Sequence, residues 1–281
     1  MHLRQGPRSG GTAFRLLHHH VGSPPGVFRP PRSNVQEVLA AIPGIESRAG
    51  KVLSIGVRKG RAASVVLANG DEIPTNLVVS GADPRRTLLE LVDPGWLDPE
   101  LARALRHVRR RGVVARLTLQ LDRPPGFSTL VVAPSLDYLE RAYDDAKYGR
   151  VSQHPYLEAY CDERHRLEVY VQYVPYEAQD SAALGDLVSK MLSEHLAGAV
   201  VTAQRVLAPR ELEAVEGWPE GQAHDAELTL DQALWMRPIP QLARYRTPID
   251  GMWLCGPAMH PGGGIAGASG YNCAREILCA S

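Results

Sequence analysis

The chain has 281 residues, 44% of them hydrophobic, and its 31 basic and 31 acidic residues give a formal net charge of zero. This length allows one large domain or two of ordinary size. The balanced charge argues against a nucleic-acid-binding surface, and no apolar run approaches the roughly 18 residues that a membrane-spanning helix requires. We therefore expect a globular protein without a nucleic-acid partner.

The first 33 residues are rich in glycine, proline and arginine and predict an irregular segment over residues 1–33. Three consecutive histidines, His18 to His20, cannot all face one ion from a regular element, so we expect ring contacts or a turn and no metal site. Five arginines and no acidic residue precede Glu37, which is typical of a transit peptide. The four cysteines form no Cys-x-x-Cys pair and fit a reducing compartment. We expect a cytoplasmic location, with a mitochondrial one as the alternative.

Residues 34–84 predict one helix and several strands. Ser33 or Asn34 can cap a helix over 34–42, which Pro43-Gly44 would end. Strands are expected at 52–55, 63–67 and 77–80, with a hairpin turn at Asn69-Gly70. The last strand leads into Asp83-Pro84, a pair that suits the start of a helix.

The next segment predicts a basic helix and then further strands. Residues 99–111 place Leu101, Leu105 and Val108 on one helical face and arginines around the rest. Such a helix can lie on an anionic membrane, and a solvated charged face is the alternative. Strands are expected at 113–121 and 167–174, followed by a helix at 180–197 that packs on their sheet.

Tyrosines are concentrated in the middle of the chain, where eight of the ten lie between Tyr138 and Tyr176. In a strand over 167–174, Tyr170 and Tyr173 point to opposite faces. Apolar rings with polar tips suit a pocket for a large, mostly apolar substrate, and packing within the sheet is the alternative. Tyr170 and Tyr173 are therefore candidate substrate residues.

The C-terminal stretch combines a short strand over 251–255, a glycine-rich turn and a helix over 265–278. Glycines allow a backbone to pass close to a ligand, and the helix directs its free N–H groups into the turn. The spacing Gly262-x-Gly264-x-x-Gly267 is not a dinucleotide fingerprint. That motif opens a βαβ unit with an acidic residue about 20 positions further on, for which no room exists before Ser281.

Cys255-Gly256 and the turn from His260 to Gly264 resemble the hallmark of the phytoene desaturase-like FAD-dependent oxidoreductases. Within that family the chain is most similar to the branch of pyridine nucleotide-disulfide oxidoreductase domain-containing protein 2. Further similarities follow one another along the chain from Gly221 to Gly251. The family's N-terminal Gly-x-Gly-x-x-Gly unit has no counterpart in residues 1–60, so the chain is expected to match only the C-terminal half.

The resemblance implies FAD as the cofactor and assigns residues to it. The expected cofactor-binding residues are Gly256, Pro261, Gly262, Gly263, Gly264, Ile265, Ala82 and Asp83. His260 is the candidate catalytic residue, with a plain turn histidine before Pro261 as the alternative. His224, Arg237 and Tyr245 join the two tyrosines as candidate substrate residues.

The expected fold is α/β or α+β, the C-terminal part of a Rossmann-like FAD-binding fold with a mixed β-sheet substrate domain. Residues 34–84 and 217–281 would form a discontinuous FAD-binding part, and 85–216 the substrate domain. The expected function is an FAD-dependent dehydrogenase or desaturase for an apolar, isoprenoid-like substrate. Without its own ADP-binding unit, the chain would expose apolar faces and form a homodimer or join a partner chain that supplies that unit. The alternative is an inactive remnant that binds a partner or a membrane surface.

Overall fold

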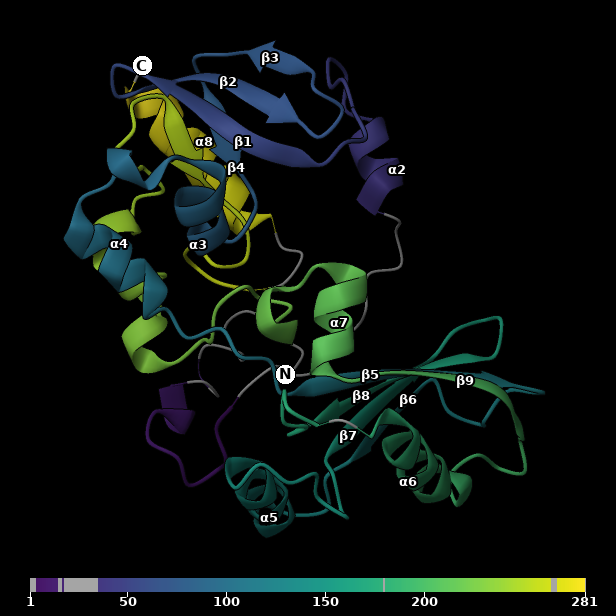
Figure 1. Ribbon diagram of the computed structural model, residues 1–281. Coiled ribbons are helices and arrows are strands. Elements are labelled where there is room, and N and C mark those ends of the chain that lie inside the picture. Colours follow the sequence, from purple (N-terminus) through teal and green to yellow (C-terminus); the bar gives the residue numbers. More distant parts are fainter. Residues whose placement is uncertain (1–3, 15–16, 18–34, 179, 264–266, 281) are drawn as a thin grey trace.

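The computed structural model describes residues 4–14, 17, 35–178, 180–263 and 267–280. The elements gather around two separate hydrophobic cores, with α7 (Pro209–Glu216) between them (Figure 1). The three consecutive histidines lie outside the described residues.

The first group contains an antiparallel sheet of β1 (Val52–Arg58), β2 (Arg61–Leu67) and β3 (Glu72–Pro74), preceded by α2 (Val35–Ala40). The predicted hairpin turn is confirmed between β2 and β3, where Gly70 has φ +90°. The backbone N–H of Leu67 donates to the carbonyl of Asp71 at 2.9 Å and closes this turn. A second turn at Lys59-Gly60, which the periodicity did not indicate, joins β1 and β2.

Two short parallel strands lie at the centre of the first group. β10 (Met252–Leu254) pairs with β4 (Val78–Ser80) in the register Met252 with Val78. Helix α8 (Ala268–Ala280) follows β10 and lies beside this pair in Figure 1. The predicted strand over 77–80 therefore exists, and its partner is the C-terminal strand, more than 170 residues away along the chain.

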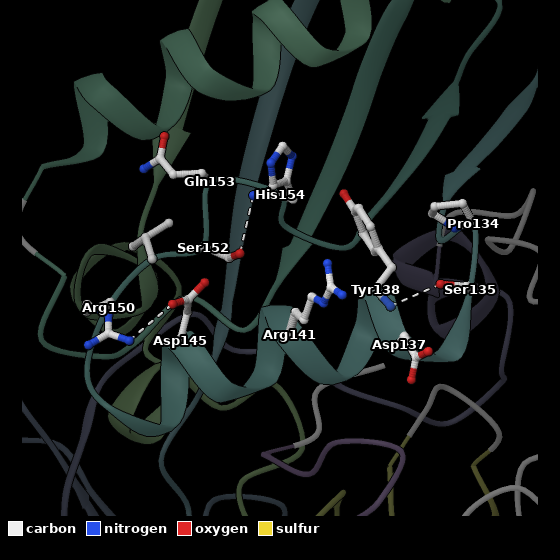
Figure 2. Close-up of a pocket in the computed structure, with 11 residues that line it drawn as sticks. Pro134, Ser135, Asp137, Tyr138, Arg141, Asp145, Arg150, Ser152, Gln153 and His154 are labelled. Atoms are coloured by element: carbon white, nitrogen blue, oxygen red, sulfur yellow. Dashed lines mark hydrogen bonds and ion pairs between the residues drawn. The ribbon is translucent and has the colours of Figure 1, made fainter.

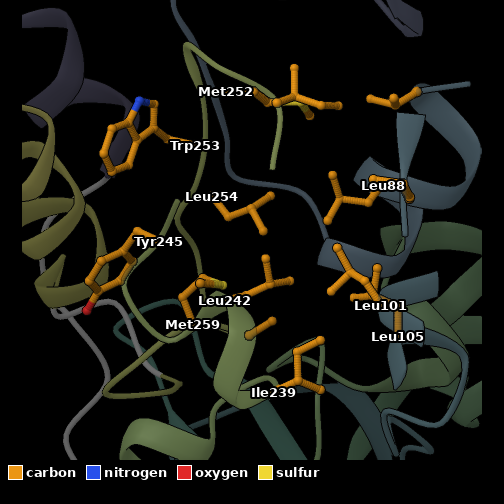
Figure 3. Close-up of a cluster of buried hydrophobic side chains, with 14 of the residues drawn as sticks. Leu88, Leu101, Leu105, Ile239, Leu242, Tyr245, Met252, Trp253, Leu254 and Met259 are labelled. Atoms are coloured by element: carbon orange, nitrogen blue, oxygen red, sulfur yellow. The ribbon is translucent and has the colours of Figure 1, made fainter. Parts of the chain in front are cut away.

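A helical segment follows β4 and completes the first core. It contains α3 (Pro84–Arg86), the π-helical turn η1 (Thr87–Leu91), the 3-10 turn η2 (Pro94–Trp96) and α4 (Pro99–Arg106). Figure 3 shows Leu88, Leu101 and Leu105 from this segment packed near Leu242 and Leu254. The segment from Leu88 to Val108 thus belongs to the first core.

The predicted helix over 99–111 is too long at its C-terminal end. α4 ends at Arg106 with His107 as its C-cap, although Leu101, Leu105 and Val108 are buried as expected. Beyond it the backbone of Arg109 bonds elsewhere: its N–H donates to Gln232 Oε1 at 2.7 Å and its carbonyl accepts from Glu227 N at 2.8 Å. These tertiary contacts replace further helical hydrogen bonds.

The second group is a five-stranded sheet. Its strands are β6 (Thr129–Val132), β7 (Leu157–Cys161), β8 (Arg166–Gln172), β5 (Val114–Leu121) and β9 (Val201–Leu207), in that order across the sheet. All four pairings are antiparallel, so the expected mixed sheet is wrong. Antiparallel strands alternate between a core face and a second face.

The core face of this sheet is covered by α6 (Ser181–Ser193), as predicted from its apolar stripe. Asp180 caps α6 by accepting from Ala183 N at 2.8 Å, and Leu184, Val188 and Leu192 pack against the strands. Helix α5 (Leu136–Lys147), capped by Ser135, was not predicted. No helix in the described ranges is long and apolar enough to span a membrane.

Four 3-10 turns connect the sheet back to β10. They are η3 (Pro219–Gly221), η4 (Leu230–Gln232), η5 (Leu234–Met236) and η6 (Pro240–Leu242). Within the described residues, two chain segments pass between the two groups, one before β5 and one after α7. They cross at Gly112, whose N–H donates to the carbonyl of Glu220 at 2.9 Å.

Candidate functional site

The carboxyl ends of the two parallel strands meet at a pair of glycines. Cys255 N donates to the carbonyl of Ser80 at 2.8 Å, and Gly256 follows with φ +92°. A Cβ on Gly256 would lie 2.7 Å from the carbonyl oxygen of Gly81, so only glycine fits. Ligands of open α/β sheets bind beyond the carboxyl ends of parallel strands. This end of the β4–β10 pair is therefore the candidate site.

Residues 256–263, here called the glycine turn, pack against two side chains from the preceding loop. A Cβ on Gly262 would lie 2.8 Å from Arg237 Nε, and one on Gly263 would lie 2.6 Å from His224 Nδ1. Within the turn, Met259 N donates to Gly256 O and Gly263 N donates to Pro257 O, both at 3.2 Å. The glycines thus let the backbone lie directly on His224 and Arg237.

Arg237 is fully buried, with 0% of its surface exposed. Its guanidinium makes six hydrogen bonds to backbone carbonyls between 2.7 and 3.3 Å. The acceptors are the carbonyls of His224, Ala226, Glu227, Gln232 and Pro257. The side chain therefore joins residues 224–232 to the glycine turn through Pro257.

Tyr245 supports the turn from the side of α8. Its hydroxyl donates to the carbonyl of His260 at 2.8 Å and accepts from Asn272 Nδ2 at 3.1 Å. His260 Nδ1 is buried and has no hydrogen-bond partner in the described part of the chain. Ser269 Oγ, in the first turn of α8, is also buried and has no hydrogen-bond partner among the described residues. Buried polar atoms normally find a hydrogen-bond partner, and these two have none among the described residues.

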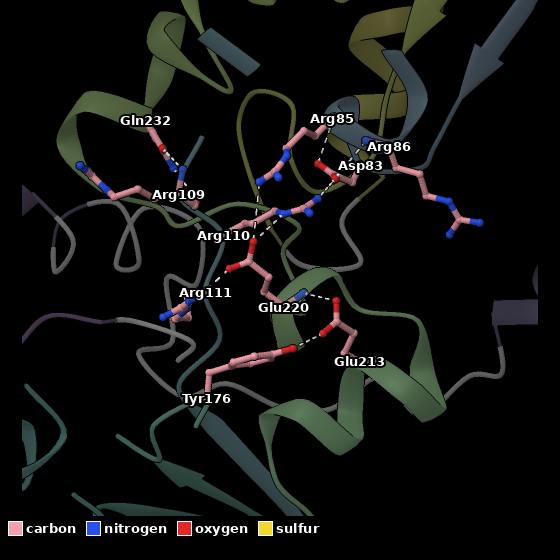
Figure 4. Close-up of polar contacts among 10 residues, drawn as sticks. All are labelled: Asp83, Arg85, Arg86, Arg109, Arg110, Arg111, Tyr176, Glu213, Glu220 and Gln232. Carbon is pink, nitrogen blue, oxygen red and sulfur yellow. Dashed lines mark hydrogen bonds and ion pairs between the residues drawn. The ribbon is translucent and has the colours of Figure 1, made fainter. Parts of the chain in front are cut away.

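Two carboxylates lie on the β4 side of the site. Asp83 is 3% exposed, accepts from Arg85 N and Arg86 N as the cap of α3, and forms an ion pair with Arg110 (Figure 4). Burial raises the pKa of Asp83 above its usual range, although the charge of Arg110 lowers it. Burial, and then the charge of Asp83, raises the pKa of Asp225 to about 7, against the lowering effect of Arg237 and Arg110.

Three consecutive arginines hold the crossing segments together. Arg109 contacts Asp231 at 2.6 Å, and Arg110 contacts Glu220 at 3.2 Å as well as Asp83. Arg111 contacts Glu177 at 2.5 Å and Glu220 at 3.5 Å. Figure 4 shows Arg110 and Arg111 on either side of Glu220. These arginines were expected on a helix and are instead engaged in ion pairs at the junction of the two groups.

The structure brings most of the predicted site residues together and separates others. Those placed at the ends of β4 and β10 or around the glycine turn are Gly256, His260, Pro261, Gly262, Gly263, Ala82, Asp83, His224, Arg237 and Tyr245. Gly264 and Ile265 lie outside the described residues. Asp225 was missed, because a single aspartate after His224 carries no signal in the sequence.

Tyr170 and Tyr173 lie in the second group. Tyr170 is on β8, with its ring 6.2 Å from that of Tyr160. Tyr173 falls beyond β8 at φ +67°, and its hydroxyl donates to the carbonyl of Gln5 at 2.8 Å. Tyr173 thus binds the N-terminal segment, and neither tyrosine contacts the glycine turn in the described contacts.

One cavity among the described residues lies away from this site. It has a volume of about 640 Å³ between α5 and residues 150–154, and Figure 2 shows Tyr138, Arg141 and His154 around it. None of the predicted site residues lines it. A second cavity of about 450 Å³ includes Asp83 and Arg110. The described residues contain no cluster that could hold a metal ion.

Comparison with known proteins finds relatives whose names describe an oxidoreductase domain or a dehydrogenase subunit. No family model matches the chain. The rat protein named pyridine nucleotide-disulfide oxidoreductase domain-containing protein 2 is 29% identical over 97% of this chain and 55% of its own length. One of the subunits of limonene dehydrogenase from Castellaniella defragrans is 27% identical over 40% of this chain and 22% of its own. The chain thus spans about half the length of the rat relative.

Among solved structures, a putrescine oxidase triple mutant redesigned in its cofactor binding matches with a TM-score of 0.52. The match covers 83% of this chain and 49% of that one at 12% identity, so it concerns the fold alone. The chain is therefore a mixed α/β protein with the fold of about half of that oxidase. The chain is thus similar in sequence to a protein named as an oxidoreductase and in fold to an oxidase.

Proposed function

We propose that the chain provides the flavin-contacting half of an FAD-dependent oxidoreductase, a dehydrogenase or desaturase that acts on an apolar, isoprenoid-like substrate. The observation that carries this proposal is the meeting of β4 and β10 at Gly81 and Gly256. There the two carboxyl ends adjoin the glycine turn, and α8 follows. The oxidoreductase name of the rat relative supports the same reaction class.

The residues present suit a flavin at this place. The glycines let the backbone of the turn lie directly on Gly81, Arg237 and His224, and two buried polar atoms, His260 Nδ1 and Ser269 Oγ, lack partners in the described residues. The N-terminal end of α8 adds a partial positive charge. When bound, the flavin would supply the redox chemistry by accepting a hydride from the substrate. Gly256, Pro261, Gly262 and Gly263, with Ala82 and Asp83 opposite, would hold it.

The chain's own residues would hold the glycine turn in position and exclude water from the bound flavin. They would not transfer protons. Arg237 and Tyr245 bond to the backbone at Pro257 and His260, so they fix the turn. His260 Nδ1 is the side-chain atom best placed to accept or donate a hydrogen bond to the bound group. Hydride removal from an unactivated carbon requires no general acid or base from the protein.

The apolar substrate class is supported by one relative. The limonene dehydrogenase relative acts, by its name, on limonene, which is a small hydrocarbon. That relative is also one chain of a larger enzyme by its name, which supports our proposal that a partner chain, or a second copy, completes the site. A cytoplasmic protein, with a mitochondrial location as the alternative, remains part of this proposal.

A visible absorption spectrum of the purified chain, alone and after incubation with FAD, tests the cofactor. We expect a bound flavin after gel filtration. Gly263→Ala would press a methyl group against the His224 ring and weaken the binding. Gly270→Ala is the matched control, since a Cβ there meets nothing within 4 Å. Absence of flavin from the wild-type chain under both conditions would refute the proposal for the chain alone.

The second candidate function is a non-catalytic module that binds a partner chain. Its supporting observation is the exposed apolar surface of the first group, where Val79 on β4, Tyr271 and Leu278 on α8 are 45%, 64% and 76% exposed. Membrane attachment through α4 is a further form of this candidate, and salt-sensitive binding to anionic vesicles would test it. Because Arg109 to Arg111 are ion-paired off the helix, α4 offers fewer free cations than expected.

A further inference from the structure

We propose that the cavity between α5 and residues 150–154 is a second binding site, which takes a small anion that carries a planar ring. A nucleoside monophosphate and an aromatic carboxylate share this chemistry. None of the residues assigned to the flavin lines this cavity, so the inference goes beyond the proposed function and does not depend on it.

The cavity is large enough for such a ligand. Its volume is about 640 Å³, and ligand sites in proteins usually have between about 300 and 1,000 Å³. One wall is a face of α5, where Tyr138, Arg141 and Asp145 follow one another at helical spacing. Figure 2 shows Arg141 extending from this helix toward residues 152–154, which belong to the opposite wall. A bound molecule would therefore contact two separate segments of the chain.

Arg141 is the cation of the cavity that is open to a ligand. Its guanidinium has no ion-pair partner among the described residues, whereas both acids that line the cavity are already paired. Asp145 pairs with Arg150 at 3.3 Å, and Asp137 pairs with Arg8 at 2.7 Å. A planar guanidinium binds a carboxylate or a phosphate through two parallel hydrogen bonds. The anionic group of the ligand would therefore lie on Arg141.

A buried hydroxyl group lies in the same cavity. Ser152 is 4% exposed, and its Oγ accepts from His154 N at 3.2 Å. A hydroxyl can also donate one hydrogen bond, and that of Ser152 has no acceptor among the described residues. An oxygen of a phosphate or carboxylate group can accept this bond. Ser152 would thus be a second contact for the anionic group.

Two rings provide a surface for the planar part of the ligand. The ring of Tyr138 lies 6.4 Å from that of His154, and their planes are tilted by 55°. The Tyr138 hydroxyl donates to the carbonyl of Pro155 at 3.0 Å, which holds its ring in place. Aromatic side chains attract another ring by offset stacking or by edge contacts. The two rings beside Arg141 therefore favour an anion with a planar ring over inorganic phosphate.

Calorimetric titration of the chain with AMP, benzoate and inorganic phosphate tests the inference. We expect AMP or benzoate to bind more tightly than phosphate, and the tighter of the two identifies the class of ligand. Arg141→Met should weaken this binding roughly tenfold or more, because hydrogen bonds to a charged group are lost. The substitution should not disturb the fold, since Arg141 is exposed and methionine suits a helix.

Arg164→Met is the matched control. Arg164 is exposed in the turn between β7 and β8 and does not line the cavity, so this variant should bind like the wild type. His154→Gln tests the ring contact and should weaken the binding of AMP or benzoate more than that of phosphate.

Three results would overturn the inference. The first is that the wild-type chain binds none of the three probes. The second is that phosphate binds as tightly as AMP and benzoate, because the rings would then contribute nothing. The third is that Arg141→Met binds the ligand as tightly as the wild type. If FAD also displaced AMP in that case, the nucleotide would occupy the glycine turn, in agreement with the proposed function alone.

Discussion

Asp225 is a carboxyl group of the site whose ionisation falls close to neutral pH. Burial and the charge of Asp83 raise its pKa from 3.8 to about 7. Below pH 3.8 the carboxyl is protonated in both the folded and unfolded states and contributes nothing. As the pH rises from 3.8 to 7, the unfolded state releases the proton first, so the free energy of unfolding falls.

Replacing Asp225 by asparagine removes this ionisation and should stabilise the protein at alkaline pH. We expect a gain on the order of a few kcal/mol at pH 8 and a smaller one as the pH falls toward 4. Urea denaturation of both proteins across this range measures the difference. A gain that is equal at pH 4 and pH 8 would show that Asp225 is ionised normally in the folded protein.

Tyr245 acts through its hydroxyl, which bonds to His260 O and Asn272. Tyr245→Phe leaves both groups without this partner and should lower the free energy of unfolding by roughly 1–2 kcal/mol. It should also weaken flavin binding, because the carbonyl of His260 is no longer held. Tyr271→Phe, at a tyrosine that is 64% exposed, is the control and should have little effect on either measurement. Equal effects of the two substitutions would contradict the role of Tyr245.

At the scale of elements, the two segments that cross between the groups depend on one close backbone contact. A Cβ on Gly112 would lie 2.2 Å from the carbonyl oxygen of Gly221, and one on Gly221 would lie 2.3 Å from that of Pro209. The hydrogen bond from Gly112 N to Glu220 O holds the two backbone segments at this short separation.

Gly112→Ala should therefore destabilise the protein by about 1–3 kcal/mol through steric overlap with backbone. The thermal midpoint, followed by circular dichroism, measures this loss. Gly10→Ala provides the control, since a Cβ there meets nothing within 4 Å. An unchanged midpoint in Gly112→Ala would mean that the two segments can separate without loss of packing.

The same elements show why some predictions failed. The apolar spacing of Leu101, Leu105 and Val108 correctly indicated a buried face, but it contained no information on where the helix ends. Gln232 and Glu227, far away in the sequence, bind the backbone of Arg109 and end the helical pattern. The strand over 77–80 was located correctly by its composition, yet its pairing with β10 follows only from the folded chain.

At the scale of the whole molecule, the first group leaves apolar side chains exposed on β4 and α8. Parallel strands are usually covered on both faces, and exposed apolar patches of this kind favour association. We expect light scattering to show a species larger than the monomer at micromolar concentration. Val79→Thr combined with Leu278→Gln should shift it toward the monomer.

Leu136→Gln is the matched control for this experiment, because Leu136 is 71% exposed but lies at the start of α5 in the second group. The control variant should associate like the wild type. A wild-type chain that remains monomeric at all concentrations would show that the exposed side chains of β4 and α8 do not form an interface.

The sequence by itself determined the local features of this protein. The hairpin glycine at Gly70, the caps Asp83 and Asp180 and the apolar stripe of α6 are set by neighbouring residues, through backbone sterics and short-range hydrogen bonds. The candidate residues His224, Arg237 and Tyr245 were identified by resemblance to a family, and their places around the turn follow from contacts over 13 to 27 residues.

Only the tertiary structure decided the rest. The periodicity of the sequence shows which face of an element is apolar, but not which element packs against that face. It therefore could not predict the antiparallel sheet, the pairing of β4 with β10 or the place of α4 in the first core. The charge states at the site likewise depend on burial and on charges brought together by folding. Asp225 and Asp83 are 142 residues apart in the chain, and their interaction exists only because folding brings the loop of Asp225 close to the end of β4.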